Sequence, residues 1–386
     1  MLQYLVVICL LFALFINKIA NGEVETIMER AVRAKLNNLH NIVTKHINMK
    51  RTCSDDTFIY ITDGGYGNTG NNMVSLTHSL WLARKLNATF NIPGFIGEAI
   101  NHFNLTNLAE QHCFVVNQKI SSTSKSYGIT AEESFFVYRL FNSPNKSFKA
   151  MLPPLDDEVV KDITHTFLNV YASLWSSPKP SIVTSAAWII ENYLGANFNY
   201  TSIHKRNLDG ECEAIMSENS KISDYSPSEL AMDSPEWSRD VEHHHPLCEM
   251  QLDFVKNTMK LHGRGDRNIF VAFDGQGDVT SYRIHRAVFS SVMQAHPRFR
   301  AIPMKYVDML VAMLGDFFIL NPRSTFSLQV YLVRASWELR SVPVQFENDF
   351  YFQKIPDHLK AEGRPMWVSL RGIQAEVQKL LAIGGG

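Results

Sequence analysis

Residues 57–92 have the sequence TFIYITDGGYGNTGNNMVSLTHSLWLARKLNATFNI, from which the fold class can be inferred. Its aromatic and β-branched run at 57–62 predicts a strand, the glycine-rich segment 63–70 a tight turn, residues 73–86 a helix and residues 89–92 a second strand. Two strands joined in this order run parallel, because the crossover is right-handed. The glycine turn is therefore expected at the carboxyl edge of the sheet, where such folds bind ligands.

The rest of the chain continues the alternation of helices and strands. Helices are expected at 23–47, 159–174, 185–194, 250–261, 282–293 and 325–339, and strands at 199–204, 268–273, 298–302 and 317–320. This order is typical of an α/β protein, here with two Rossmann-like, doubly wound domains facing a cleft. The 386 residues suffice for two or three folding units, at roughly 150 residues per domain.

The expected segments follow from these patterns. They are a leader at 1–22, an amphipathic helix or stem at 23–50, an N-terminal domain at 55–198, and a C-terminal domain at 199–386 with a polar loop at 213–242. The helix either packs on the domains or serves as a lumenal stem.

The N-terminus indicates the secretory route. Residues 4–16 form an apolar run of 13, shorter than the about 20 residues that cross a bilayer. The run indicates a cleaved signal peptide ending near residues 20–22, or a short signal anchor; a buried core helix is the third interpretation. Sequons at Asn87, Asn104, Asn145 and Asn199 also favour export, to the lumen of the endoplasmic reticulum or Golgi, or to the outside.

The cysteines fit an oxidising compartment. If Cys9 leaves with the leader, Cys53, Cys113, Cys212 and Cys248 remain, an even number suited to two disulfides. Three pairings are open, and we favour Cys212 with Cys248 because they bracket the polar loop. Four buried thiols are the alternative.

Composition excludes two broad classes. Apolar residues make up 45% of the chain, which excludes global disorder. The formal charge is −1, from 37 Lys and Arg against 38 Asp and Glu, so no surplus of cations is present to bind the phosphates of a nucleic acid.

The glycine turn carries the first candidate site. Gly67 and Asn68 stand just before a helix, whose free amides favour anions. No Lys-Ser or Lys-Thr pair follows, so the turn is not a P-loop. A tight turn without a ligand would have the same sequence.

The segment His204-Lys205-Arg206 ends a strand, and alternation places His204 and Arg206 on one face. The Arg206 guanidinium would clamp a phosphate and offset the charge of a leaving diphosphate. A surface ion pair with Asp209 is the alternative. Asp274 follows another strand and either lines the nucleotide pocket or caps a turn.

The third candidate site lies in residues 307–333. A strand is followed by a helix start whose hydroxyls and free amides would seat a phosphate, with Ser324, Thr325, Phe326 and Ser327 as the binding residues. Asp308 would accept hydrogen bonds from a base that offers an N–H and an amino group, as guanine does. An N-cap without a ligand is the alternative.

Together these segments resemble GDP-fucose-dependent fucosyltransferases of the superfamily that contains the peptide O-fucosyltransferases and the α-1,2- and α-1,6-fucosyltransferases. GGYGN at 64–68 is similar to their GGxGN or GRFGN loop, and HKR at 204–206 to their HxR motif. The spacing from Asp308 through Asp316 and Asn321 to Ser327 resembles the peptide O-fucosyltransferase type. The resemblance covers most of residues 57–335.

The resemblance implies a GT-B fold, with GDP-fucose on the C-terminal domain and the acceptor on the N-terminal domain. It also implies inversion at the sugar carbon, usually without a metal or other cofactor. Three positions depart from the family pattern: Gly65 stands in place of Arg, Thr69 in place of Gln, and Asn207 in place of a second Arg found in some relatives.

The sequence therefore predicts a lumenal enzyme, secreted or held by an N-terminal anchor, that transfers fucose from GDP-fucose to a hydroxyl of a glycan or glycoprotein. Arg206 is the first catalytic candidate, and Glu211 and Glu213 are candidate bases. Two alternatives stay open: transfer from another nucleotide sugar on the same fold, and a secreted sugar-binding protein without activity.

Overall fold

The structure is a computed structural model. It describes residues 25–47, 49, 51, 53–54, 56–65, 67, 69–135, 140–141, 151–154, 156–206, 250–275, 277–299, 301–321 and 324–342.

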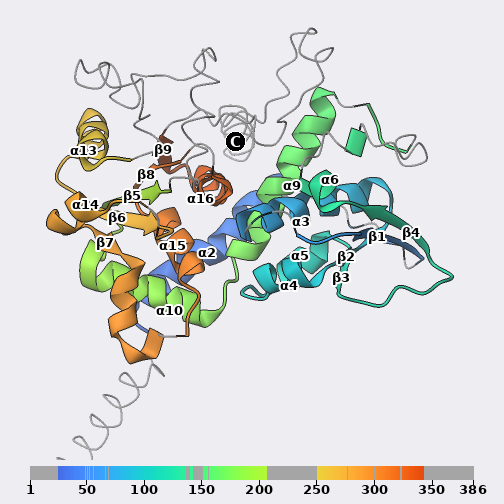
Figure 1. Cartoon of the computed structure of the whole chain (residues 1–386), viewed down its shortest axis with the longest axis horizontal. Helices are drawn as coiled ribbons and strands as arrows, with labels where there is room; N and C mark the ends of the chain where they lie inside the picture. The colour runs from blue at the N-terminus through green and yellow to red at the C-terminus, as the bar shows by residue number, and fades with distance from the viewer. Residues whose placement is uncertain are drawn as a thin grey trace, which may run out of the picture.

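Two separate sheets form the frame of the molecule (Figure 1). The first has the order β3-β2-β1-β4, with β1 at Thr57–Ile61, β2 at Thr89–Ile92, β3 at Phe114–Val116 and β4 at Lys125–Ile129. The second has the order β7-β6-β5-β8-β9, with β5 at Tyr200–Lys205, β6 at Asn268–Phe273, β7 at Val288–Phe289, β8 at Phe317–Ile319 and β9 at Arg340–Val342.

All the pairings between these strands are parallel. In each sheet the first strand lies inside, and the order reverses on its two sides, which is the doubly wound topology. The predicted α/β fold with two Rossmann-like halves of GT-B type is therefore confirmed. The reversals fall beside β1 and β5, so the glycine turn and Arg206 both follow a switch-point strand.

Helices connect and cover the sheets. In the first half they are α2 (Ile27–His46), α3 (Thr69–Lys85), α4 (Gly94–Ile100), α5 (Thr106–Gln111), α6 (Ala131–Phe135), α9 (Asp157–Trp175) and α10 (Pro180–Ile189), which continues as a π-helix at Ile190–Leu194. In the second half they are α13 (Leu252–Leu261), α14 (Thr280–Ile284), 3₁₀ turns at Ser290–Ala295 and Pro297–Phe299, α15 (Met304–Leu314) and α16 (Thr325–Ser336).

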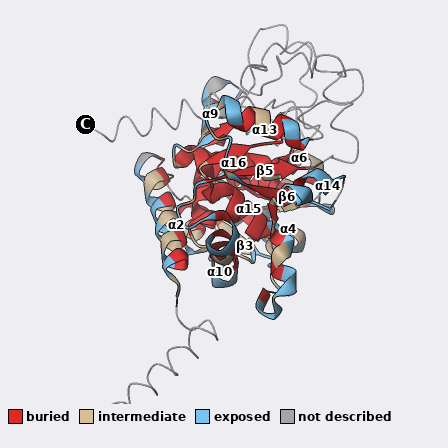
Figure 2. Cartoon of the chain, turned by 90° about the vertical axis from the view of Figure 1, so that its left-hand side faces the viewer, coloured by how far each residue is buried: buried red, intermediate tan, exposed pale blue. Residues whose placement is uncertain are grey.

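Successive side chains along each strand point to opposite faces of the sheet, so they are buried in two different apolar layers. On β6, Ile269 and Val271 pack with α13 and α14, whereas Phe270 and Ala272 face the larger core that contains α15 and α16. This larger core continues without a break to the first sheet, because α9 contacts both α3 and α16. The buried interior is visible in Figure 2.

The amphipathic N-terminal helix packs on this core. Thr26 and Glu29 form a reciprocal capping box at its start. Its apolar side chains at spacings of three and four residues are buried against α9, α10 and α16. In Figure 2 the ribbon of α2 alternates between buried and more exposed residues. Among the helices that the structure describes, none has the length and apolar character needed to cross a membrane.

Two predictions in the second half are wrong. The helix expected at 282–293 is instead the end of α14, strand β7 and a 3₁₀ turn, and the strand expected at 298–302 contains the end of another 3₁₀ turn. Arg286 has a φ of 61°, which interrupts a helix, and Pro297 and Pro303 divide the remaining run. The predicted pattern also missed α15, which carries Asp308.

One disulfide is present among the described residues. It joins Cys53, before β1, to Cys113, before β3, with the two Cα atoms 5.5 Å apart. The alternative of four free thiols is therefore wrong for this pair. Cys212 and Cys248 lie outside the described residues, and their pairing stays a prediction. Asn87, Asn104 and Asn199 are exposed, whereas Asn145 also lies outside the described residues.

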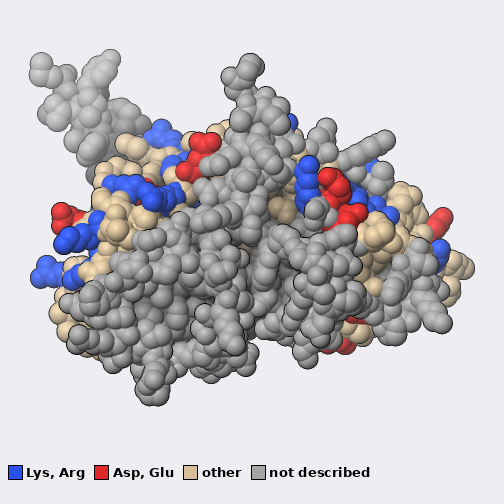
Figure 3. All heavy atoms as spheres, turned by 90° about the horizontal axis from the view of Figure 1, so that it is seen from above, with Lys and Arg blue, Asp and Glu red and all other residues tan. Residues whose placement is uncertain are grey.

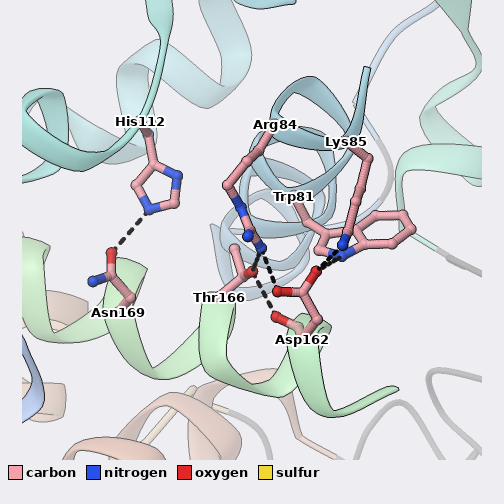
Figure 4. Close-up of polar contacts among 7 residues, drawn as sticks. All are labelled: Trp81, Arg84, Lys85, His112, Asp162, Thr166 and Asn169. Carbon is pink, nitrogen blue, oxygen red and sulfur yellow. Dashed lines mark hydrogen bonds and ion pairs between the residues drawn. The ribbon is translucent and has the colours of Figure 1, made fainter. Parts of the chain in front are cut away.

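Charges on the described surface are mixed in sign. Figure 3 shows basic and acidic side chains interspersed on the visible face, in agreement with the near-zero formal charge. Figure 4 shows one such group between α3 and α9, where the Asp162 carboxylate accepts hydrogen bonds from Trp81 at 2.9 Å and Arg84 at 2.7 Å and pairs with Lys85 at 2.7 Å. Burial acts to raise the pKa of Asp162, but the bonds from Lys85 and Arg84 lower it overall.

A buried arginine fixes the far end of α15. Arg334 on α16 is fully buried, and its guanidinium donates to the carbonyl oxygens of Ala312, Met313 and Gly315 at the carboxyl end of α15. It also donates to the Arg340 carbonyl at 2.5 Å and to Ser341 Oγ at 3.0 Å on β9. Burial lowers the pKa of Arg334 to about 9, so it remains a cation at neutral pH and suits the negative end of the helix.

We expect Arg334→Met to lower the free energy of unfolding by at least about 3 kcal/mol, because each buried carbonyl left without a donor costs about 1–3 kcal/mol. Arg334→Lys should have an intermediate effect, since it keeps the charge but reaches fewer carbonyls. Urea denaturation measures the change, with the exposed Arg283→Met as the matched control. Equal stabilities of the two methionine variants would contradict this structural role.

Candidate functional site

A cavity of about 470 Å³ lies at the carboxyl edge of the second sheet, beside the start of α3. Candidate site residues from three distant segments of the sequence line this cavity. They are His204, Arg206, Asp274, Asp308, Thr325 and Phe326. Thr69 and Gly70, which follow the glycine turn, line it from the first half of the chain. The 204–206 segment and the 307–333 segment therefore meet in one cleft with the start of α3.

The register of the sheet places Arg206 beside Asp274. Strands β5 and β6 are paired with Lys205 opposite Phe273, so the next residue of each strand lies at the same level of the carboxyl edge. Arg206 Nε lies 3.3 Å from Asp274 Oδ2, and each side chain is 24% exposed. The Asn321 side chain donates to the Arg206 carbonyl oxygen at 2.8 Å, which anchors the backbone there. Asp209, the partner considered from the sequence, lies outside the described residues.

His204 is a buried, neutral ring in the cleft wall. Its Nδ1 lies 2.9 Å from Ser327 Oγ, and its ring stacks on Phe326 with 4.2 Å between centroids. Burial, with a further contribution from the Arg206 charge, lowers its pKa to about 3. Ser327 Oγ also accepts from the Asn321 backbone N–H at 3.0 Å, so Ser327 orients His204 and the end of β8.

The first residues of α16 contact the first residues of α3. Ser324 caps α16 by accepting the Phe326 N–H at 3.2 Å, and the Thr325 hydroxyl donates to Asn71 Oδ1 at 2.9 Å. A Cβ atom added to Gly70 would lie 2.9 Å from Thr325 Cβ, so the approach of the two helices requires glycine. The positive ends of two helices consequently adjoin the same cleft.

Asp308 places a buried carboxyl in this cleft. It lies on α15, is 6% exposed, and its Oδ1 has no hydrogen-bond partner among the described residues. Burial raises its pKa to about 7, while a hydrogen bond with Ser290 acts in the opposite direction. A buried acceptor without a partner costs free energy, and a ligand that donates to it would recover that cost.

The sequence interpretation missed Lys305, which also lines the cleft. Its Nζ donates to Thr69 Oγ1, from α15 to α3. Lys305 and Asp308 are three residues apart, which on a helix gives them one face. That spacing was visible in the sequence, but α15 itself was not predicted.

Some of the site residues predicted from the sequence cannot be compared with the structure. Asn68, Glu211 and Glu213 lie outside the described residues. Gly67 is described and has a φ of 69°, in the left-handed region that favours glycine. A Cβ atom at Gly65 would lie 2.8 Å from Phe95 Cδ2, so Phe95 occupies the space that a longer side chain there would need. Among the described residues, no group of three or more His, Cys, Asp or Glu side chains is arranged to hold a metal ion.

Among the comparisons with known proteins, only the comparison with solved structures found similar chains. No protein-family model matches the chain, and no curated protein matches it. The chain is similar to the crystal structure of POFUT1 in its apo form, with 16% identity and a TM-score of 0.44 over 75% of this chain and 98% of that one. It is similar to POFUT1 in complex with GDP (14% identity, TM-score 0.41, 75% and 98% of the two chains). It is also similar to POFUT1 in complex with GDP-fucose (13% identity, TM-score 0.41, 74% and 97%).

The raised pKa of Asp308 predicts a pH-dependent stability. The folded protein holds this proton up to about pH 7, whereas the unfolded chain loses it near pH 3.8, so the free energy of unfolding falls as pH rises between these values. Asp308→Asn removes this loss. The free energy of unfolding of Asp308→Asn, relative to that of the wild type, should therefore increase by about 2–3 kcal/mol between pH 5 and pH 8, at about 1.36 kcal/mol per pKa unit.

Urea denaturation of the two proteins across this pH range, without ligand, measures the difference. Asp278→Asn is the control, because Asp278 is exposed and its pKa is lowered, chiefly by its hydrogen bonds with Thr280. A constant difference between Asp308→Asn and the wild type at all pH values would show that Asp308 ionises normally.

Proposed function

We propose that this protein transfers a fucosyl group from GDP-fucose to a hydroxyl of a glycan or glycoprotein. The proposal rests chiefly on one observation: residues of two segments that resemble fucosyltransferase motifs, 204–206 and 307–333, line a single cleft together with Thr69 and Gly70, which directly follow the third. The cleft has a buried acceptor at Asp308 that has no partner among the described residues, a guanidinium at Arg206 and a capped helix start at Ser324.

The base is recognised by the Asp308 carboxylate. Guanine presents an N–H and an amino group side by side, and a carboxylate accepts from both. Uracil presents one N–H between two carbonyl oxygens, and adenine has no N–H on its six-membered ring. Either base would leave the buried oxygen of Asp308 without a donor or place an acceptor against it, so guanine is favoured.

The leaving diphosphate is stabilised by fixed positive groups. The acceptor oxygen forms a bond to the anomeric carbon from the face opposite the diphosphate, the bond between that carbon and the phosphate oxygen breaks, and GDP leaves with the electron pair. The configuration therefore inverts. In this proposal Arg206 and the positive end of α16 offset the developing charge, and the reaction uses no metal. Glu211 or Glu213 would take the hydroxyl proton.

The remaining assignments follow from the same arrangement. The acceptor would bind on the side of the first sheet, across the cleft from the nucleotide. The disulfide between Cys53 and Cys113 supports a location in the secretory lumen, where disulfides persist. The apolar run at 4–16 would direct the chain there, as a leader or an anchor.

Arg206 provides the test of this function. We expect Arg206→Ala to reduce fucosyl transfer from GDP-fucose by on the order of a hundred- to a thousand-fold, the usual cost of removing one electrostatic donor. Arg206→Lys should recover only part of the rate, since an ammonium lacks the planar two-pronged contact. Transfer to a mixed panel of glycan and glycoprotein acceptors is measured, with Arg283→Ala as the control.

The ligand-free melting temperature of both Arg206 variants should stay close to that of the wild type, because the ion pair with Asp274 is partly exposed. A near-normal rate in Arg206→Ala would contradict the mechanism. Transfer by the wild type from a UDP-sugar, with none from GDP-fucose, would show a different donor on the same fold.

A further inference from the structure

Lys305 reaches across the cleft from the C-terminal half to the N-terminal half. It is the second residue of α15, and its Nζ donates a hydrogen bond to Thr69 Oγ1, on the first residue of α3. The same ammonium lies 5.3 Å from the ring centroid of Tyr306. A hydroxyl and an aromatic ring are neutral partners, so neither of them balances the charge of Lys305.

Among the other described groups in the cleft, the charges of Arg206 and Asp274 cancel, and Asp308 is only partly ionised at neutral pH because burial raises its pKa to about 7. Arg206 is paired with Asp274 at 3.3 Å, and His204 is neutral because burial keeps its pKa at about 3. Lys305 has no carboxylate within ion-pair distance among the residues that the structure describes, and the nearby Glu98 only partly opposes the lowering of its pKa by desolvation. Its positive charge is therefore available to an anionic ligand.

Its position on α15 relates it to the base-recognition residue. Lys305 and Asp308 are separated by three residues, so both project from one helix face into the same cavity. Lys305 lies on the side nearer the start of the helix and contacts the start of α3, which in turn contacts the start of α16. Both of these helix starts have free amides. A nucleoside diphosphate whose base meets Asp308 has its anionic end within reach of this side.

We propose that Lys305 is a diphosphate-binding residue, which exchanges its hydrogen bond to Thr69 for a charge-assisted bond to the phosphate of a bound nucleoside diphosphate. This inference rests on the proposed function. It adds a second cation, supplied from α15, to the guanidinium of Arg206. It also makes the contact between Lys305 and Thr69 a feature of the ligand-free protein.

Calorimetric titration with guanosine, GMP and GDP tests the proposal, because the three ligands share the base and differ in phosphate. In Lys305→Gln, GDP should bind about tenfold more weakly or worse, the usual cost of losing a hydrogen bond to a charged group, whereas guanosine should bind as in the wild type. Lys305→Arg, which keeps a cation, should recover most of the GDP affinity. Lys179→Gln is the matched control, a lysine that lines a different cavity.

The variant Thr69→Val distinguishes a role of Lys305 in ligand binding from a role in stabilising the fold. It removes the hydrogen bond to Lys305 but retains the lysine charge, so its GDP affinity should equal or exceed that of the wild type. Equal weakening of guanosine and GDP in Lys305→Gln, unchanged GDP binding in that variant, or the same loss in Lys305→Arg or Thr69→Val would overturn the role of Lys305. Absence of GDP binding by the wild type would overturn the proposed function as well.

Discussion

The contact between the starts of α3 and α16 is the constraint on which the cleft depends. The Thr325 hydroxyl donates to Asn71 Oδ1 at 2.9 Å, and Gly70 leaves no room for a side chain between the two helices. Helix α3 follows β1, and α16 follows β8, which pairs with β5 at the switch point of the second sheet. This one contact therefore sets the carboxyl edges of the two sheets next to each other. The start of α3, the end of β5 and the start of α16 line one cavity for this reason.

Helix α15 links the stability of the fold to the chemistry of the cleft. Its carboxyl end is tied by Arg334 to α16 and β9, which fixes the helix along its axis. Its other end carries Lys305 and Asp308 into the cavity, and the Tyr306 hydroxyl donates to the Ala99 carbonyl of the first half at 2.6 Å. A buried carboxyl with a free oxygen is unfavourable in the absence of a ligand. The packing around α15 holds it in place, and in the proposed function guanine satisfies it.

The sequence predicted the parts of the fold that depend on local periodicity. Strands β2 and β6 were predicted to the residue, because β-branched and aromatic runs are bounded there by turns or polar residues. The secondary structure predicted between residues 282 and 314 was wrong, since the apolar spacing there is interrupted by a left-handed Arg286 and two prolines, and no helix was predicted at 304–314. The motifs in the sequence identified His204, Arg206, Asp308 and Thr325 as candidate site residues. The pairing of Arg206 with Asp274, however, depends on the register of the sheet. The position of Lys305 in the cleft depends on how α15 packs. Neither can be obtained from spacing along the chain.

A structure of the protein in complex with GDP would show whether the cleft between the two halves is a nucleotide site. We expect the guanine base to lie against Asp308, with Oδ1 accepting from the base, and the diphosphate to lie between Arg206, Lys305 and the start of α16. The Lys305 ammonium should then no longer contact Thr69. GDP bound outside this cleft, or bound in it with the base directed away from Asp308, would show that these residues do not form the proposed site.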